Sequence, residues 1–441
     1  MRKISLMLLA LAATVTVQAQ RVCGSMEHLS HQIQEDPSLV QRMESIEEHT
    51  AKFEKANPNG QRVVITIPTV VHVVWRTGKA VENISDAQVQ SQIDVLNADF
   101  RKLNADASLI PAAFSGVAVD YEIQFCLAKR TPTGAATNGI VHYQKTRNKD
   151  WGTNNDVKKP TRGGVAPWDA TKYLNIWVCS IGGGILGYAQ FPGGSVTTDG
   201  VVLDYRYTGT TGTATSPYHL GRTATHEVGH WLNLRHIWGD ATCGSDLVGD
   251  TPTHNTANYG CPSQPHLSTC TGTPREMTMN YMDYTDDACM YMFSAGQKTR
   301  SQALFASGGS RVGLLTSLGC QIPSATPVIV MNNDGDTYGE LAEQPDFGTI
   351  RIVEDAPVMS IYPNPTKDNI TVSLLIDSPL SHNVSLSILD QMGRNVRTIK
   401  HTLDMFNSEV NLDMSDLANG LYYIQYNKEG VLATEKVVLQ R

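Results

Sequence analysis

The segment from His226 to His236 carries residue types that bind and use a metal ion. Its sequence is HEVGHWLNLRH. On a helix, His226 and His230 are one turn apart on the same face, so both imidazoles can bind one Zn²⁺ with Glu227 at its open side. His236 supplies a third ligand and leaves the fourth position to water. Zn²⁺ lowers the pKa of that water and Glu227 can take its proton, which gives a nucleophile for a peptide carbonyl.

The third histidine reaches the same metal only if the helix ends between His230 and His236 and the chain turns sharply. Such a turn usually needs a residue that tolerates positive φ, and the metzincin pattern HExxHxxGxxH has glycine there. This chain has Asn233 instead. Because asparagine is the non-glycine residue best suited to the left-handed conformation, we expect Asn233 to make the turn.

Residues 280–284, Asn-Tyr-Met-Asp-Tyr, look like a metzincin Met-turn, in which a methionine lies beneath the zinc histidines as an apolar floor. With both motifs, the chain resembles the pappalysin, or M43, family of metzincins, and is similar to compact bacterial members such as ulilysin and cytophagalysin. The resemblance covers residues 62–320.

The resemblance implies roles for individual residues. Glu227 would be the general base, and Tyr284 a phenol near the metal that stabilises the tetrahedral oxyanion, with a core tyrosine as the alternative. Met282 would be the Met-turn methionine. The implied zinc ligands are His226, His230 and His236.

Residues 243–252 look like the calcium-binding loop of the same family, in which carboxylates and carbonyls surround a hard cation. The implied calcium ligands are Asp246, Asp250 and Thr251. The family pattern also pairs Cys243 with Cys270 and Cys261 with Cys289. Four cysteines alone admit three pairings, so this connectivity rests on the resemblance. The pairing of Cys126, Cys179 and Cys320 stays open.

Cys23 stands alone in a polar, charge-rich stretch, residues 20–61, which we interpret as a pro-segment. We expect its thiolate to fill the open position of the zinc and hold the enzyme latent. Gly24 would let the chain pass close to the metal, and Arg21 would pair with a carboxylate there. A disulfide from Cys23 to Cys126, Cys179 or Cys320 is the alternative. Activation would require a cut near Gln61-Arg62.

The first 19 residues have the pattern of a secretory signal peptide. Arg2 and Lys3 precede an apolar run from Ile4 to Val17, and small residues offer a cleavage site after Ala19. The run is too short to span a bilayer with any margin, so we expect no transmembrane anchor. The net charge of −8 disfavours a nucleic-acid partner. We expect a secreted or cell-surface protein that is exported via the periplasm.

The predicted protease domain, residues 62–320, begins with a long β-branched strand over 62–75. A helix is expected over 86–103, because Ser85 can cap it and apolar residues recur at spacings of three and four. Further strands are predicted at 120–129, 173–180 and 200–205, with a glycine-rich connection at 181–194. This order predicts an α/β (α+β) fold with a mixed sheet and helices on it.

A linker is predicted at 321–355, where proline, asparagine, aspartate and glycine dominate, followed by an all-β sandwich at 356–441. The predicted strands include 371–376, 384–389 and 422–426. Through Ser-Ile-Tyr-Pro-Asn-Pro at 360–365 and Leu-Ala-Asn-Gly-Leu-Tyr at 417–422, this module resembles a type IX secretion sorting domain. The resemblance implies export by the type IX secretion machinery; a carbohydrate-binding or stalk module is the alternative.

These features together predict a secreted zinc endopeptidase that acts on proteins or peptides and is made as a zymogen. The rival hypothesis is a non-catalytic, zinc-containing surface binding protein or adhesin. A structural zinc site would normally close the fourth position with protein, whereas Glu227 lies where a base is needed. Asp286 and Asp287 follow the Met-turn, and a preference for basic residues after the scissile bond depends on whether either carboxylate points into the pocket.

Overall fold

The computed structural model describes residues 20–58, 60, 63–323, 359–374, 382–391, 394–403, 409–428 and 431–441. It divides the chain into two compact units, Met1–Val328 and Ile329–Arg441. The predicted signal peptide, the expected cut at 61–62 and nearly all of the predicted linker lie outside the described residues. In the described part of the chain, no helix is long and apolar enough to cross a membrane.

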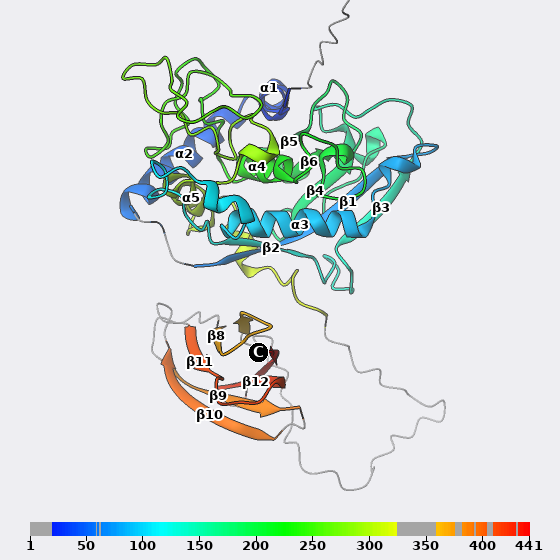
Figure 1. Cartoon of the computed structure of the whole chain (residues 1–441). Helices are drawn as coiled ribbons and strands as arrows, with labels where there is room; N and C mark the ends of the chain where they lie inside the picture. The colour runs from blue at the N-terminus through cyan, green and yellow to red at the C-terminus, as the bar shows by residue number, and fades with distance from the viewer. Residues whose placement is uncertain are drawn as a thin grey trace, which may run out of the picture. The chain divides into compact units, whose positions relative to one another are not determined.

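The first unit is built on a six-stranded sheet (Figure 1). The strands run in the order β2-β1-β4-β6-β5, and β3 pairs with the second half of β1. All pairs are parallel except that of β5 with β6, so the predicted mixed sheet is confirmed. The bounds are β1 (Ile65–Arg76), β2 (Ile123–Leu127), β3 (Ile140–Lys145), β4 (Leu174–Cys179), β5 (Gly187–Ala189) and β6 (Val201–Asp204).

Two strands of this sheet, β3 and β5, were not predicted, and β5 lies beside the site. The strands expected at 120–129, 173–180 and 200–205 correspond to β2, β4 and β6, each shorter than predicted. The glycine-rich connection at 181–194 contains the additional edge strand β5. A three-residue strand that begins with a glycine gives no alternating pattern, and pairing with β6 alone makes these residues a strand.

Two helices cover the same face of the sheet, α3 (Asp86–Phe100) and α4 (Arg222–Trp231) (Figure 1). Ser85 caps α3 by accepting a hydrogen bond from the main chain of Gln88 (3.2 Å). The helix ends at Phe100, earlier than the predicted 103, and Lys102 just beyond it has a φ of 51°. The predicted apolar face of α3 is buried against α4 and β2.

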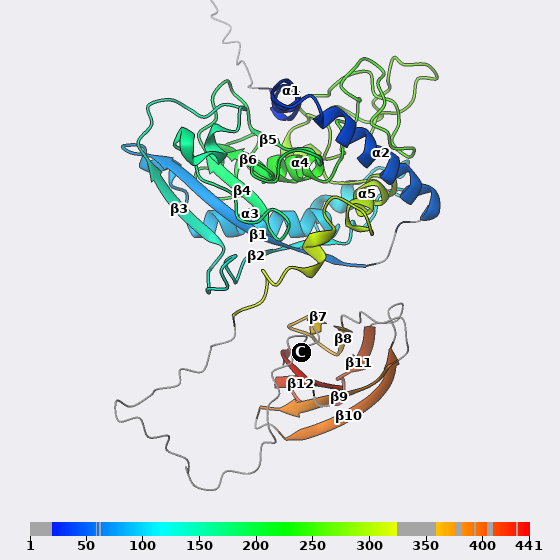
Figure 2. The same cartoon turned by 180° about the vertical axis from the view of Figure 1, so that it is seen from behind.

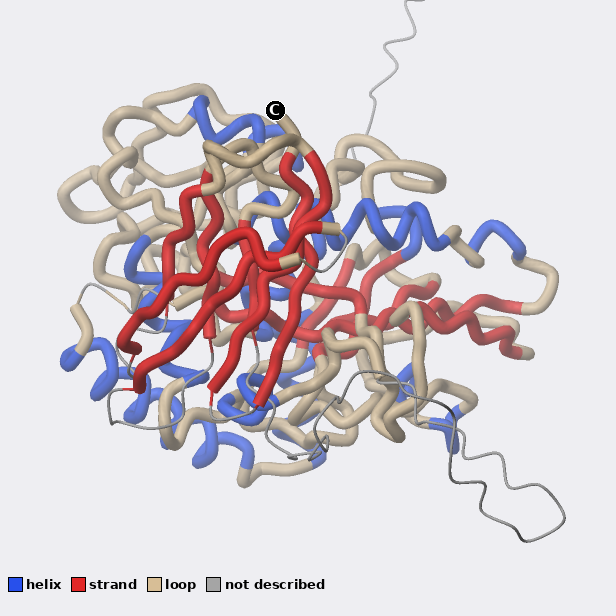
Figure 3. The backbone as a smooth tube through the Cα atoms, turned by 90° about the horizontal axis from the view of Figure 1, so that it is seen from below, coloured by secondary structure: helices blue, strands red, loops and turns tan. Residues whose placement is uncertain are grey.

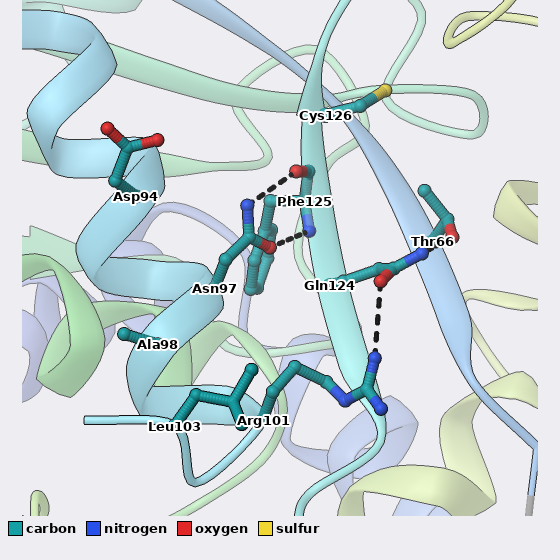
Figure 4. A pocket seen from close by; sticks show the side chains of 9 residues that line it. All are labelled: Thr66, Asp94, Asn97, Ala98, Arg101, Leu103, Gln124, Phe125 and Cys126. Carbon is teal, nitrogen blue, oxygen red and sulfur yellow. Dashed lines mark hydrogen bonds between the residues drawn. The ribbon is translucent and has the colours of Figure 1, made fainter. Parts of the chain in front are cut away.

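The edge of the sheet at β2 is closed by a side chain of α3. Figure 4 shows Asn97 donating to the carbonyl of Phe125 (3.0 Å) and accepting from its main-chain N–H (2.7 Å). The amide thereby takes the place of a neighbouring strand at this residue and protects an otherwise open edge. The hollow around it has a volume of about 560 Å³ and contains none of the predicted site residues.

The predicted pro-segment is more ordered than its composition suggested. It forms two helices, α1 (Ser25–Glu35) and α2 (Leu39–Ala56) (Figure 2). Helix α1 packs against β5, and α2 against α5 (Ala295–Gln302). Leu39 and Phe53 are buried, so this polar stretch joins the core of the first unit through a few apolar contacts.

The second unit is all β, as predicted. It contains a four-stranded antiparallel sheet, β10-β9-β12-β13, and a three-stranded one, β11-β8-β7, whose inner faces share one apolar core (Figure 3). The strands are β7 (Met359–Tyr362), β8 (Asn369–Leu374), β9 (His382–Asp390), β10 (Asn395–Leu403), β11 (Glu409–Asp413), β12 (Gly420–Lys428) and β13 (Val431–Leu439).

Candidate metal centre and active site

Helix α4 brings two of the predicted ligands together, and the turn after it brings the third. His226 and His230 lie one turn apart and are buried, with their Nε2 atoms 3.2 Å apart. The helix ends at Trp231, and Asn233 has a φ of 70°, in the left-handed region. The chain therefore reverses and places His236 Nε2 3.1 Å from His230 Nε2.

The hydrogen bonds of the three rings indicate which nitrogen is free. His226 Nδ1 donates to the carbonyl of Tyr281 (2.7 Å), and His230 Nδ1 to that of Leu234 (2.8 Å). His236 Nδ1 lies 2.5 Å from a carboxylate oxygen of Asp240. Because carbonyls only accept, Nδ1 of His226 and of His230 carries the proton and Nε2 keeps a lone pair.

Three Nε2 atoms converging in a buried space fit a tetrahedral metal ion. Nitrogen ligands about 2.0–2.1 Å from zinc lie about 3.3–3.4 Å from one another, close to the spacing here. Burial, and then the neighbouring histidines, keep the pKa of His226 well below its usual range, and the same causes lower that of His230 to about 3. Both imidazoles are therefore neutral at pH 7, which is the form that binds metal.

Three side chains far downstream hold the end of α4. The last carbonyls of a helix have no hydrogen-bond donor within the helix, so a buried helix end needs donors from elsewhere in the chain. Arg311 donates to the carbonyl of Trp231 (3.0 Å), Ser301 to that of Leu232 (2.8 Å) and Arg300 to that of Asn233 (2.8 Å). The sequence did not identify these three residues as part of the site, because no local pattern links them to the histidines.

Glu227 is buried beside the histidine cluster on the side of β5. A Cβ at Gly187 would lie only 2.9 Å from Glu227 Cγ, so glycine is required where the strand passes the carboxylate. Burial raises the pKa of Glu227 to about 7, against the opposing hydrogen bonds from Ser25 and Cys23. A carboxyl group with this pKa can both accept and release a proton near neutral pH.

Cys23 completes the cluster. Its Sγ and the ligand nitrogens of His226, His230 and His236 all lie within 4.8 Å of one another. Sγ also lies 3.4 Å from a carboxylate oxygen of Glu227, and Ser25 Oγ donates to the same oxygen (2.8 Å). The sulfur thus lies between the general-base candidate and the metal-ligand candidates.

Residues 22–24 hold Cys23 there by pairing with the outer edge of β5. Leu186 N–H donates to the carbonyl of Val22 (2.9 Å), and Gly24 N–H to that of Gly187 (2.8 Å), in a parallel arrangement. A Cβ at Gly24 would meet Thr153 at 2.8 Å, so glycine is required where the chain passes this residue. The predicted close passage of Gly24 to the metal stays a prediction.

Met282 packs against α4 at Gly229, and Tyr284 packs against the histidine cluster. Met282 is fully buried, and a Cβ at Gly229 would lie 2.4 Å from its sulfur, so the glycine of the zinc motif makes room for the methionine. The Tyr284 ring packs edge-on against His236 with centroids 4.9 Å apart, and its hydroxyl accepts from the main chain of Cys23 (3.3 Å). Burial raises the pKa of Tyr284, so its hydroxyl stays protonated.

Next to the cluster, the side chain of Arg21 fills a buried site that we call the pocket of Asp287. The buried guanidinium forms an ion pair with the buried Asp287, donates to the carbonyl of Thr285 (3.2 Å) and lies 4.8 Å from the centre of the Tyr218 ring. Asp287 also accepts from the main chain of Leu220 (2.8 Å), just before α4. Of the two acids that follow the Met-turn, Asp287 therefore points into the pocket.

The two disulfides expected from the family pattern, Cys243–Cys270 and Cys261–Cys289, are present, together with Cys126–Cys320. Cys23 and Cys179 are free thiols. Cys126 and Cys320 are therefore excluded as partners of Cys23.

The predicted calcium ligands are only partly together. Thr251 Oγ1 lies 2.9 Å from both carboxylate oxygens of Asp246, whereas Asp250 accepts from Ser294 (2.6 Å) and from the main chain of Gly296 (2.8 Å) at the start of α5. Burial raises the pKa of Asp246 to about 6. The calcium site stays a prediction.

This fold and site define a metal-dependent peptidase whose cluster is covered by its own N-terminal segment. Residues 158–306 match the M43 peptidase family model, described as pregnancy-associated plasma protein-A, and residues 360–440 match a secretion system C-terminal sorting domain. An extracellular metalloprotease of Colletotrichum graminicola is 32% identical over 322 residues, 69% of this chain and 96% of that protein. One of Pyricularia oryzae is 37% identical over 252 residues, 55% of this chain and 75% of that protein.

Two solved structures match the first unit. Mature mirolysin of Tannerella forsythia, in complex with a cleaved peptide, is 46% identical, with a TM-score of 0.57 over 60% of this chain and all of that one. A promirolysin mutant of the same organism is 44% identical, with a TM-score of 0.61 over 67% of this chain and 97% of that one.

The chain belongs to the M43 family of metalloproteases. It is a secreted or cell-surface metalloendopeptidase made as a zymogen, and its C-terminal unit is a sorting domain; the rival reading as a non-catalytic binding protein is not supported.

Proposed function

We propose that the catalytic metal is zinc, held by His226, His230 and His236, and that Glu227 and Tyr284 act on the substrate beside it. The observation that carries this proposal is the convergence of three imidazole nitrogens, at spacings of 3.1 and 3.2 Å, next to a buried carboxylate. A bound zinc ion would supply Lewis-acid polarisation of a water and of the scissile carbonyl. Met282 would support the three histidines from below.

The chain's own groups would carry the protons and the charge. Glu227 takes a proton from the attacking water and passes it to the leaving nitrogen. Burial already raises the pKa of this carboxyl group to about 7 in the latent form, which suits it to such a shuttle. Tyr284 keeps its proton and donates a hydrogen bond to the carbonyl oxygen as negative charge develops there. The edge of β5, now paired with residues 22–24, is free to hold an extended substrate once the pro-segment leaves.

Metal removal tests the proposal directly. After activation, hydrolysis of casein should stop on treatment with a zinc chelator and return when one equivalent of Zn²⁺ per chain is added, because the three histidines alone have no group that polarises the carbonyl. The measurement is the release of acid-soluble peptides together with the zinc content of the protein. Activity that persists in metal-free protein contradicts the proposal.

The pro-segment would keep the enzyme latent as a ligand and as an occupant of the cleft. The Cys23 thiolate would take the position needed for catalysis, while Arg21 fills the pocket of Asp287. Burial and the carboxylate of Glu227 raise the pKa of this thiol, so the charge of the metal is what would deprotonate it. We place the pro-segment at 20–61, after a signal peptide at 1–19.

The ion pair of Arg21 and Asp287 supports a preference for a basic residue after the scissile bond. Replacing Asp287 by Asn should lower kcat/KM for peptides with Arg at that position by about 100-fold, because a buried guanidinium loses its counter-charge. Peptides with Leu there should be affected little, since Asn keeps an oxygen that accepts from Leu220. Asp286→Asn is the matched control, because Asp286 is the adjacent residue in the sequence and its side chain is half-exposed. Equal losses for both peptides would contradict the assignment.

For export we propose that the sorting domain, with boundaries at 356–441 after a linker at 321–355, is read by the type IX secretion machinery after passage through the periplasm. The match of residues 360–440 to a sorting-domain family supports this. For calcium, the support is the buried carboxylate of Asp246 beside Thr251; Asp250 would have to leave its contacts with α5 to join them.

A further inference from the structure

We infer that the activated enzyme binds an acidic substrate side chain, two or three residues before the scissile bond, through Lys158 and Lys159. This inference rests on the proposed function, because it assigns a second specificity site in the same cleft. The groups concerned are Lys158, Lys159 and the Tyr188 ring, which we call the lysine subsite. In the latent form two residues of α1 contact it, His28 at the Tyr188 ring and Glu35 at Lys159.

The pro-segment crosses the metal cluster, so its two sides mark the two sides of the cleft. Arg21 precedes Cys23 and lies in the pocket of Asp287, whereas α1 follows Cys23 and packs against β5 (Figure 2). If the pocket of Asp287 takes the residue after the scissile bond, the surface beneath α1 takes the residues before it.

The contacts of His28 show which groups lie beneath α1. The ring is fully buried, its Nδ1 donates to the carbonyl of Thr153 (2.6 Å), and its centroid lies 4.9 Å from that of Tyr188. The Lys158 ammonium lies 5.2 Å from the centre of the same Tyr188 ring. His28 and Lys158 are therefore neighbours on one aromatic side chain, and burial followed by the charge of Lys158 lowers the pKa of His28.

Lys158 is a buried amine, and burial lowers its pKa to about 7. Its Nζ donates to the carbonyl of Thr198 (2.8 Å) and lies 5.3 Å from the centre of the Trp177 ring. No carboxylate of the described residues lies within ion-pair distance of it. Asp199 acts on it from farther away, but the carboxylate of Asp199 is bonded to Arg311 and Trp231. An incoming carboxylate would favour the protonated form, because it would give the buried ammonium a partner.

The pro-segment itself carries a complementary acid. Glu35, at the end of α1, lies 3.8 Å from the Lys159 ammonium. The segment thus offers a base to Asp287 on one side of the metal cluster and an acid to the lysines on the other. Removal of the pro-segment leaves both counter-charges open to substrate.

The distance along the cleft sets the substrate position. From Gly24 to His28 the chain is helical and advances about 1.5 Å per residue, about 6 Å in all. An extended substrate advances about 3.3 Å per residue, so the second or third residue before the scissile bond reaches the position of His28, which shares the Tyr188 ring with Lys158.

The test compares peptides that share Arg after the scissile bond and carry Glu, Gln or Lys at the second or third position before it. The full precursor, activated by limited proteolysis, should cleave the Glu peptide about five- to tenfold faster in kcat/KM than the Gln peptide, with the Lys peptide slowest. Lys158→Met and Lys159→Gln should each reduce this ratio. Arg162→Gln, an exposed charge in the same loop, is the matched control and should leave the ratio intact.

The outcomes separate the two levels of inference. The lysine subsite is overturned if the unsubstituted enzyme cleaves the Glu and Gln peptides with equal kcat/KM. It is also overturned if both lysine variants keep the preference for the Glu peptide. An equal fall in the Arg162→Gln variant overturns it too, because a diffuse field would then be the cause. If no peptide of the series is cleaved, the proposed function fails and takes the subsite with it. Lys159 is about one-third exposed, so its variant tests the idea even if Lys158→Met does not fold.

Discussion

Replacement of Glu227 by Ala is expected to lower peptide hydrolysis by at least about 10²–10⁴-fold and to leave about one zinc ion per chain. Among the described residues, Glu227 is the only acid in contact with Cys23 Sγ, so its carboxylate lies beside the metal site. The ligand atoms that converge there belong to other residues: His226, His230, His236 and Cys23. The base and the ligands are therefore separate groups on one helix. Kinetics on a fluorogenic peptide, combined with metal analysis of the purified protein, check both parts.

His230→Ala is the natural comparison for that variant. It removes the central imidazole, which lies within 3.2 Å of both other ligand nitrogens, so metal and activity should be lost together. If Glu227→Ala also loses its metal, or if it keeps its activity, the role assigned to the carboxylate is wrong. A variant that keeps zinc and loses turnover separates catalysis from metal binding.

The sequence predicted those parts of the site that depend on local spacing. The helical repeat brings His226 and His230 together, and Asn233 has the backbone conformation expected of it, because both follow from neighbours within a few residues. Helix α3 and the strand β1 were likewise readable from their caps and apolar repeats, with ends displaced by a few residues.

The remaining features depend on residues that are distant in sequence. Strand β5 exists because it pairs with β6, and Asp287 is distinguished from Asp286 only by the direction in which its side chain points. Arg300 and Arg311 reach the end of α4 from more than 60 positions away, and nothing near either residue shows that target. Helix α1 contains polar residues whose partners, such as the carbonyl of Thr153, belong to the protease domain. Such contacts require the tertiary structure.

Replacement of Cys23 by Ala should make the uncleaved precursor active. The sulfur lies within 4.8 Å of all three ligand nitrogens, and its removal would open the fourth position to water. Arg21, Ser25 and α2 would still hold the segment, so we expect partial activity, a rise of about tenfold or more. Loss of a ligand bond worth at least about 1.4 kcal/mol shifts the closed-to-open equilibrium by that factor.

Cys179→Ala is the matched control, because Cys179 is the second free thiol and is buried in a separate apolar cluster. The precursors should be purified with Glu227 intact and assayed at once for peptide cleavage and for self-processing. Early activity in Cys23→Ala alone supports the switch. Unchanged latency rejects it, and so does a disulfide between Cys23 and Cys179, the one pairing that the other three disulfides leave possible. Addition of Arg21→Ala to Cys23→Ala should raise the activity further, because the ion pair with Asp287 holds the same three-residue stretch in the cleft from its other end.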